Sequence, residues 1–450
     1  MNRPTPRLGG GTTATQSPQW LATARMLRRA GFGASGRQVD AAVSQDWSVY
    51  LDTALNMNPD ADPGAVATPM PTPSTPPLPP DNANQQVRTQ FISGLYGQMQ
   101  ELSAWWLRRM AAVQQPIHEK LTLVWHNHFA TSAEKVVAAE LMAAQNQKLR
   151  TLALGDFRVL AYAMLTDAAM AQWLDAVRNT KAAPNENLSR EFMELFTLGH
   201  NNGYTEADVR EGARALTGRY VAPGATTIVS PENHDTSPKT VLGVTGNHDD
   251  KAFCDIVLGQ PGSADFIAGK LWRLLASDAP AAPDTRARLV AAYGPDRNLK
   301  ALTKAVFLDP AFTAAAGSMV TPPVEWLLGV IRALAVPLDS PDTIAGCSAV
   351  LTVMGQRPFY PYDVGGWPRG QAWLSTTSTA ARVWAANKFV PMGDISIVQD
   401  AGAGDRVDAA GYLLGIGAWS DSTATALRPL AGNPVRLVIA AINTPEYLTS

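Results

Sequence analysis

The feature that most constrains how this chain can fold is an apolar pattern with the period of an α-helix, which begins at Asn84. It continues through four stretches separated by short breaks: SAWWLRRMAAV, IHEKLTLVWHNHF, AAELMAAQNQKLRTLAL and FRVLAYAMLTDAAMAQWLD. Apolar residues at this spacing form a stripe along one side of a helix, and that stripe must be buried against another element. Several such helices in succession predict a helical core and a mainly α fold.

The same spacing extends over most of the remaining sequence. Helical patterning covers residues 18–55, returns at 249–272 and 285–335, and appears again near the C-terminus. In RMLRRAGFG the first helix is expected to end at Gly31 and Gly33, because glycine readily adopts the left-handed conformation that closes helices. No repeat of fixed period stands out, so residues 1–450 are expected to form one large helical domain.

Three segments interrupt the helical pattern. Residues 59–80 contain nine prolines, which should exclude helix and central strand and predict an extended surface connector. Residues 219–248 are rich in Gly, Pro, Thr and Val and predict a small β-hairpin insertion with exposed loops. Residues 355–373 interleave aromatic rings with Gly and Pro. If exposed, these rings could stack on sugars or proline-rich peptides; if buried, they would fill a core beneath the loop.

Charge and composition narrow the classes of partner. The formal net charge is -2, with 37 Lys+Arg against 39 Asp+Glu, so no overall basic field is present to hold nucleic acid or an anionic membrane. The longest apolar runs, residues 413–419 and 437–442, are much shorter than the roughly 20 residues of a membrane span. We therefore expect neither a nucleic-acid partner nor a membrane span.

Two features of the sequence indicate in which cellular compartment the protein is found: its cysteine content and its N-terminal segment. Cys254 and Cys347 are too few for a disulfide framework or a cysteine-built zinc site, so both are expected to be small buried residues, with a single bridge as the alternative. Residues 1–16 show no apolar segment after their two arginines, so no secretory signal peptide is visible. A cytoplasmic location is the default expectation.

The stretch NENLSREFMELFTLG, residues 185–199, contains the strongest candidates for catalytic residues. On a helix, Glu186, Arg190 and Glu194 fall on one polar stripe opposite an apolar face. Glu191 lies at the boundary beside two leucines, where partial desolvation would raise the pKa of its carboxyl group and suit it to act as a general acid. The alternative is that the stripe only forms i,i+4 ion pairs on a solvated face.

Histidines are the second group of candidates. His126 and His128, in VWHNHF, would point about 200° apart on a continuous helix, so they could share a metal ion only if the helix ended there. His234 and Asp235, with His248 further on, leave a mixed His and carboxylate divalent-metal site open. Histidines satisfied within the core or loops are the alternative.

The stretch GYTEADVREGARALTGR should begin a helix at Thr205, with Asp208 completing a capping box. Arg210 and Arg214 could clamp an anion, or could pair with the neighbouring glutamates. Lys239, in HDTSPKT, offers a cation to a substrate phosphate, sulfate or carboxylate, or else forms an ordinary loop salt bridge.

Together these stretches resemble a bacterial family known as domain of unknown function 1800. The matching segments, in order, are MLRRAGFG, VWHNHF, NENLSREFMELFTLG, GYTEADVREGARALTG, HDTSPKTVLG, the DD at 249–250, FIAGKLW and MGQRPFYPYDVGGW. The family pattern maps onto His126, His128, Asn185, Glu186, Arg190, Glu191, Glu194, Tyr204, Asp208, His234, Asp235, Lys239 and Trp367. The chain departs from the pattern at Arg219, where an aromatic residue is common, and at Pro368.

The resemblance also implies a partner. Members are often encoded beside a second uncharacterised protein that looks like a sulfatase or alkaline phosphatase and carries a twin-arginine export signal. This arrangement implies an association with that protein, and export as a complex.

The leading hypothesis is a hydrolase that acts on glycosidic bonds of an envelope or extracellular polysaccharide, with these polar residues converging in one cleft. Glu191 and Glu186 are the first candidates for acid and base, and His128 and Asp235 are further catalytic candidates. The expected substrate-binding residues are His126, Asn185, Arg190, Glu194, His234, Lys239 and Trp367. No cofactor is predicted; the alternatives are a metal-dependent enzyme and a non-enzymatic assembly or export partner.

Overall fold

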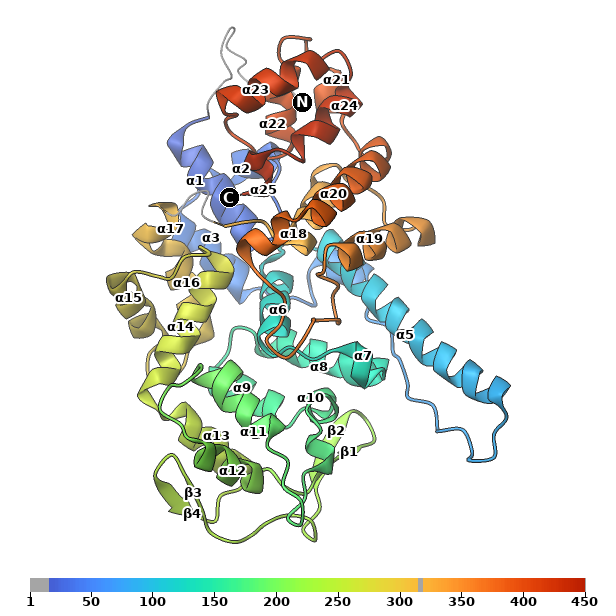
Figure 1. Ribbon diagram of the computed structural model, residues 1–450. Helices are drawn as coiled ribbons and strands as arrows, with labels where there is room; N and C mark the ends of the chain where they lie inside the picture. The colour runs from blue at the N-terminus through green and yellow to red at the C-terminus, as the bar shows by residue number, and fades with distance from the viewer. Residues whose placement is uncertain (1–15, 315–318, 450) are drawn as a thin grey trace.

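The computed structural model describes residues 16–314 and 319–449. Helices dominate this part of the chain, and its strands form two small hairpins, which confirms the mainly α fold (Figure 1). The expectation that the N-terminus lacks a signal peptide falls, apart from Gln16, outside the described residues.

The N-terminal helices begin where side chains can satisfy free backbone N–H groups. They are α1 (Pro18–Ala30), α2 (Gly36–Ala42), α3 (Trp47–Asn56) and α4 (Pro63–Ala67). The turn after α1 contains both expected glycines, but only Gly33 is left-handed, with a φ of 79°. A Cβ on Gly33 would lie 2.8 Å from the Cα of Gly329 in α18 (Pro323–Ala333), so the close approach of the two segments also requires glycine there.

The proline-rich segment 59–80 is not wholly extended, which corrects the sequence-based expectation. Pro63 begins α4, where the missing N–H of proline costs nothing because the first helical turn leaves its N–H groups unpaired. The Asp62 carboxylate caps this helix by accepting a hydrogen bond from the backbone N of Gly64 at 2.8 Å. Residues 69–80 have no regular secondary structure, as expected of a connector.

The central helices follow the predicted pattern, with breaks at the expected places. They are α5 (Gln85–Ala112), α6 (Ile117–His128), α7 (Ala133–Val136), α8 (Ala139–Leu152), α9 (Phe157–Leu165), α10 (Ala168–Trp173), η1 (Ala176–Arg178), α11 (Asn187–Glu191), η2 (Phe192–Thr197) and α12 (Glu206–Ala215). The first half of α5 projects from the body, with the connector looping back beside it (Figure 1).

The insertion at 219–248 contains two hairpins where the sequence predicted one. Strand β1 (Arg219–Ala222) pairs antiparallel with β2 (Thr226–Val229), and β3 (Lys239–Val241) with β4 (Val244–Gly246). Arg219, which replaces the aromatic residue of the family pattern, forms an ion pair with Asp250 and donates to the Thr227 hydroxyl at 2.6 Å. This residue therefore anchors the first hairpin to the start of the following helix.

The remaining helices follow the second hairpin. They are α13 (Asp250–Leu258), α14 (Pro261–Leu275), α15 (Pro283–Tyr293), α16 (Leu299–Leu308), α17 (Pro310–Ala314), α18 (Pro323–Ala333), α19 (Pro341–Val353), η3 (Gly370–Leu374), α20 (Thr376–Phe389), η4 (Val390–Met392), α21 (Ser396–Gln399), α22 (Arg406–Leu413), α23 (Asp421–Leu427), η5 (Arg428–Leu430), α24 (Pro434–Ala441) and α25 (Pro445–Leu448).

Helix α6 contributes to two large apolar clusters. Leu123 belongs to a cluster with α5, α18–α20 and the C-terminal helices, whereas Trp125 belongs to one with α9, η2, α13, α14 and α16. Cys254 and Cys347 are both buried free thiols, so the alternative of a bridge between them is wrong. Within the described residues, no helix is both long and apolar enough to cross a bilayer.

Candidate functional site

The helix predicted over residues 185–199 changes geometry halfway along. After the α-helical turns of α11, residues Phe192–Thr197 form a π-helical turn, η2, in which the N–H of Leu198 donates to the carbonyl of Met193 at 2.9 Å. The Thr197 hydroxyl also donates to the Phe192 carbonyl, at 2.5 Å. Such turns widen the helix by one residue and occur frequently at functional sites, and the apolar spacing gave no sign of this one.

Two members of the polar stripe, Glu186 and Arg190, belong to an ion-pair network, as the alternative of a solvated, ion-paired face expected. Arg190 donates to Glu186 at 2.9 Å and to both carboxylate oxygens of Glu206, the first residue of α12, at 2.7 and 2.8 Å. Asn185 shapes the preceding turn, since its side-chain oxygen accepts from the backbone N of Asn187 at 3.0 Å. Glu186 and Arg190 thereby join α11 to α12.

Glu194 does not join that network. It is hydrogen-bonded to Nδ1 of His200, whose side chain is 65% exposed, and its charge acts on the neighbouring Tyr204 phenol. Both partners come from the loop between η2 and α12. Glu194 and these two side chains therefore form a polar cluster at the surface end of η2.

Glu191 differs from the other acidic residues of this segment. Within the described residues its half-buried carboxyl group has no hydrogen bond or ion pair. Burial, then the charges of Glu194 and Asp363, raise its pKa, and Arg190 and His200 only partly oppose them. The predicted upward shift is therefore supported, and Asp363 brings a carboxylate from the 355–373 loop that the sequence analysis did not single out.

His126 is buried, 1% exposed, and faces the 355–373 loop. Its Nε2 accepts a hydrogen bond from the backbone N of Phe359 at 3.1 Å, and its ring packs edge-on against Trp106 and Trp367. Burial lowers the pKa of this imidazole to about 3, which keeps it neutral. The contacts of His126 and Trp367 in this structure hold the loop to α6.

His128 faces the other apolar cluster, so the two histidines diverge as the helical geometry predicted. Its Nε2–H donates to the carbonyl of Phe196 in η2 at 2.9 Å, and its ring lies among phenylalanines that include Phe129 and Phe266. Burial holds the pKa of this imidazole well below its ordinary value. Among residues 16–314 and 319–449, no group of three or more His, Cys, Asp or Glu side chains has the arrangement of a metal site.

The third group of candidate residues, His234, Asp235 and Lys239, forms hydrogen bonds and an ion pair in and around the loop before β3. Lys239, 1% exposed, donates through Nζ to the carbonyls of Asp235 at 2.5 Å and Ser237 at 2.9 Å. The Asp235 carboxylate pairs with Nε of Arg214 at 2.7 Å; burial would raise the pKa of Asp235, but hydrogen bonds from Arg214 and Ser237 outweigh it and lower the pKa to about 2. His234 donates through Nδ1 to the Thr217 carbonyl at 2.9 Å.

The aromatic loop is mainly a core element. Phe359, Trp367 and Trp373 are each less than 5% exposed, which favours the buried alternative, whereas Tyr362 is 87% exposed. Because Tyr362 immediately precedes Asp363, this loop presents an open aromatic ring next to the carboxylate that acts on Glu191. Glu191, Glu194, His200, Tyr204 and Asp363 thus form one polar site, whereas the environments of His126, His128 and Lys239 are separate.

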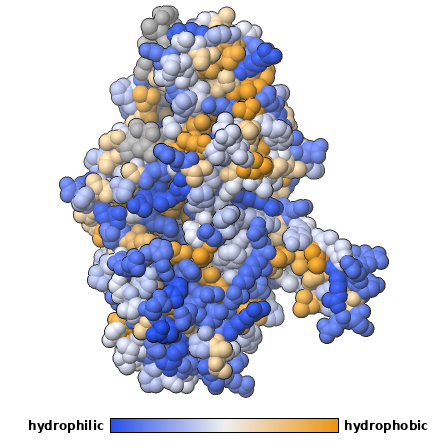
Figure 2. All heavy atoms as spheres, in the orientation of Figure 1, coloured by the Kyte–Doolittle hydropathy of each residue, from blue (hydrophilic) through white to orange (hydrophobic). Residues whose placement is uncertain are grey.

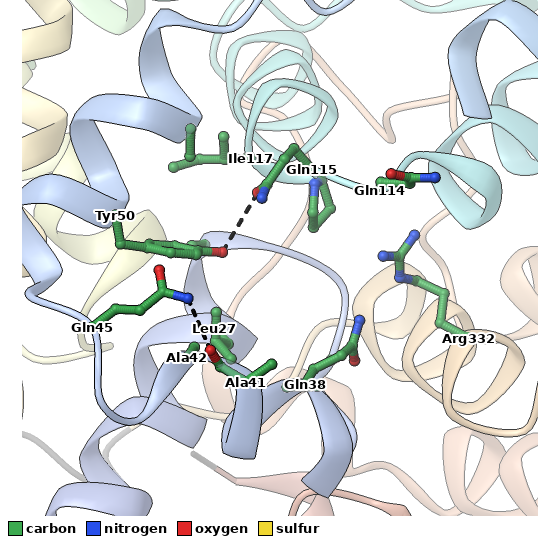
Figure 3. A pocket seen from close by; sticks show the side chains of 15 residues that line it. Leu27, Gln38, Ala41, Ala42, Gln45, Tyr50, Gln114, Gln115, Ile117 and Arg332 are labelled. Atoms are coloured by element: carbon green, nitrogen blue, oxygen red, sulfur yellow. Dashed lines mark hydrogen bonds between the residues drawn. The ribbon is translucent and has the colours of Figure 1, made fainter. Parts of the chain in front are cut away.

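A pocket of about 230 Å³ lies elsewhere, between the first three helices and the turn that joins α5 to α6 (Figure 3). Four primary amides, the Tyr50 phenol and the Arg332 guanidinium line it, together with the apolar side chains of Leu27 and Ile117. The amides belong to Gln38, Gln45, Gln114 and Gln115. Its lining has no carboxylate, so this pocket offers hydrogen bonds but no acid or base.

Fold and site together define a helical protein with a small acidic surface site beside a π-helical turn. The chain belongs to the family described as Protein of unknown function (DUF1800), whose model matches residues 25–449. No curated protein and no solved structure matches the chain significantly.

Proposed function

We propose that this protein is a hydrolase of glycosidic bonds in an envelope or extracellular polysaccharide, with Glu191 as its general acid. The observation that carries the proposal is the state of Glu191: a half-buried, unpaired carboxyl group whose pKa is raised by burial and by two neighbouring carboxylates. A general acid needs this property, because it must hold its proton near neutral pH and release it to the departing sugar oxygen.

Glycoside hydrolysis needs a second carboxylate, and the contacts favour Glu194 or Asp363 over Glu186. Glu186 is engaged by Arg190, whereas Glu194 and Asp363 both act on the proton equilibrium of Glu191. Pairs of carboxyl groups with different proton affinities are the usual arrangement for this reaction. In this proposal the second group stays charged and activates water or stabilises the positive charge that develops on the sugar.

The exposed ring of Tyr362 supports a carbohydrate substrate. An aromatic face in solvent can stack on the apolar face of a pyranose ring, and this one lies beside Asp363 in the sequence. The loop is anchored from behind, because Asn127 Oδ1 accepts from the backbone N of Trp367 at 2.7 Å. Stacking on Tyr362 would therefore place a sugar against a loop whose base is fixed to α6.

The test is hydrolysis of a panel of bacterial polysaccharides, measured as new reducing ends. Glu191→Gln keeps the shape of the side chain but cannot deliver a proton, so we expect the rate to fall by roughly 10²- to 10⁴-fold. The control is Glu232→Gln, which neutralises an exposed carboxylate in the loop between β2 and β3. Equal rates for Glu191→Gln and the parent, or no hydrolysis of any polysaccharide by the parent, would refute the proposal.

A second function, as an assembly or export partner of the sulfatase- or phosphatase-like protein, is favoured by the projecting half of α5. Val87, Ile92 and Tyr96 on this half are between 41% and 51% exposed. Apolar surface is visible on the arm formed by this helix and the connector (Figure 2). Apolar side chains on a segment with few neighbours are typical of a protein contact surface.

This second function is tested by co-expression with the neighbouring protein. The double variant Ile92→Glu, Tyr96→Glu places charges on the exposed apolar side of α5 and should abolish co-purification without unfolding the domain. Substitution of the exposed Val159 by Glu, on α9, is the control for added surface charge. Retention of the complex by the α5 variant would show that the arm is not the contact.

A further inference from the structure

Three cationic side chains lie close enough to act on one another where the 355–373 loop passes the end of α14. Lys270 and Arg273 lie on α14, one helical turn apart and thus on one side of it, and Arg369 comes from the loop. Arg369, Gly370 and Asp278 line one small cavity with Leu274 of α14. A Cβ on Gly370 would lie 3.4 Å from the Asp278 carboxylate, so the loop rests directly on the segment that follows the helix.

These three cations lack counter-charges. Within the described residues, none of them forms an ion pair or a hydrogen bond, and Nε of Arg273 is enclosed without a partner. Nζ of Lys270 lies over the ring face of Phe266, 5.8 Å from the centroid. Two carboxylates line the cavity with Arg369: Glu325 is paired with Lys120, and Asp278 already accepts a hydrogen bond from the backbone N of Val320 at 3.1 Å.

Their mutual repulsion is large enough to affect protonation. Burial, and then the charges of Arg369 and Arg273, lower the pKa of Lys270 to about 8. Burial and Arg273 likewise lower the pKa of Arg369, and Asp278 opposes this shift only in part. Three positive charges against one negative charge leave a local excess of two.

The dipole of α14 does not explain why all three cations lie together. A cation in the last turn of α14 would interact favourably with the helix dipole, which is a sufficient reason for Arg273. It gives no reason for Arg369 to be brought to the same place by a distant loop. A group of like charges held together by two segments is stable mainly when an anion joins them.

We propose that Lys270, Arg273 and Arg369 form a binding site for a doubly charged oxoanion, either phosphate or sulfate, free or as an ester on a larger molecule. Two guanidinium groups supply planar N–H pairs that match the oxygen atoms of such an anion, and the lysine supplies a third charge. A dianion would neutralise the local excess of two positive charges. The site does not depend on the proposed role of Glu191, which belongs to a different cluster.

The experiment measures anion binding to the full chain by thermal shift and calorimetry. Sodium phosphate and sodium sulfate are compared with sodium chloride at equal ionic strength, so that general screening is subtracted. We expect saturable stabilisation by both dianions beyond that of chloride. The double variant Lys270→Gln, Arg369→Gln should weaken phosphate binding by roughly tenfold or more, because each charged hydrogen-bond donor contributes strongly to such a site.

The matched control is Arg428→Gln, Arg436→Gln, which removes two exposed cations from the C-terminal region and changes the net charge equally. Arg369→Gln alone changes an exposed loop residue, so the test does not depend on tolerance of the half-buried Lys270 to substitution. The proposal is overturned if phosphate acts no differently from chloride, or if the site variants and the control bind phosphate as the parent does.

A comparison of dextran sulfate with uncharged dextran identifies the source of the anion. Tighter binding of dextran sulfate than of inorganic sulfate, lost in Arg369→Gln, supports recognition of an ester on a polymer. Binding of inorganic phosphate and sulfate alone, lost in the same variant, supports a site for the free ion. Glu191→Gln should bind both anions normally, so failure of the hydrolase proposal and failure of this one are distinguishable.

Discussion

Glu119 and Arg150 are joined by two parallel hydrogen bonds in the interior of the domain. Arg150 Nε lies 2.6 Å from Oε1 of Glu119, and Arg150 Nη2 lies 2.8 Å from its Oε2. Both side chains are at most 1% exposed, and Glu119 also accepts from Arg109 and from the indole N–H of Trp106. This network fixes the start of α6 between α5 and α8, and so orients the helix that ends at His128.

We predict that Glu119→Gln strongly destabilises the fold. Arg109 would keep its ion pair with Asp60 at 2.7 Å, but Arg150 would keep a buried positive charge that the neutral amide does not balance. Removal of one partner of such a buried pair costs about 3–5 kcal/mol. The measurement is the free energy of unfolding in urea at neutral pH, with the exposed Asp421→Asn as control. A difference below about 1 kcal/mol, the range of exposed pairs, would mean that the network contributes little.

The Glu119 carboxylate should also make the free energy of unfolding depend on pH. The network overcomes burial and lowers the pKa of Glu119 from an ordinary 4.5 to about 2. Because the folded-state pKa is depressed, this contribution is complete above pH 4.5 and is lost as the pH falls toward 2. The contribution of the ionised Glu119 to the free energy of unfolding is about 3 kcal/mol. Unfolding curves at pH 7, 4.5 and 3 should show the gap between the parent and Glu119→Gln narrowing only below pH 4.5.

The carboxylates around Glu191 make a third prediction. Asp363→Asn removes one of the charges that raise the pKa of Glu191, so that pKa should fall. Glu194→Gln should lower it further, because Glu194 has the larger effect of the two. Nuclear magnetic resonance titration of the Glu191 carboxyl carbon measures both shifts. One of these two carboxylates is the proposed second catalytic group, so the activity profile is read in the variant that keeps activity. Its loss of rate with rising pH should move to lower pH, and an unchanged profile would contradict the acid role.

The contact of His126 with the 355–373 loop should also be measurable. His126→Phe keeps an aromatic ring among Trp106, Phe359 and Trp367 but leaves the buried N–H of Phe359 without an acceptor. Such an unsatisfied group costs about 1–3 kcal/mol. Calorimetric unfolding gives this value, and His200→Phe, at an exposed histidine, should leave stability nearly unchanged. A catalytic role for His126 would instead show as lost activity with normal stability.

Local sequence patterns predicted the elements that local interactions stabilise. The capping box of Thr205 and Asp208 is present at the start of α12, and the helices of the central core occur where the apolar spacing placed them. Pro63 was read as excluding helix, although the first turn tolerates proline. The π-helical turn was missed because a hydrogen bond between residues five apart, in place of four, hardly changes the spacing of apolar residues in the sequence.

The candidate site was predicted in part. Glu191 was identified from its position at the polar–apolar boundary, and the ion pair of Glu186 with Arg190 follows from their spacing on one helix. The neighbours that define the state of Glu191 could not be found in this way. Asp363 comes from a loop far along the chain, and His200 stands alone in a turn with no motif around it.

The sequence by itself therefore determined a mainly α fold and the capped start of α12, and it supplied candidate residues for acid–base chemistry. Only the tertiary structure decided which of them are engaged: His126 bonds to the Phe359 backbone and Lys239 to loop carbonyls, whereas Glu191 has no hydrogen-bonding partner in the part of the chain that the structure describes. The physical reason is the range of the interactions. Helix capping and spacing act over a few residues, whereas burial and charge, which set a pKa, depend on segments that meet only in the folded chain.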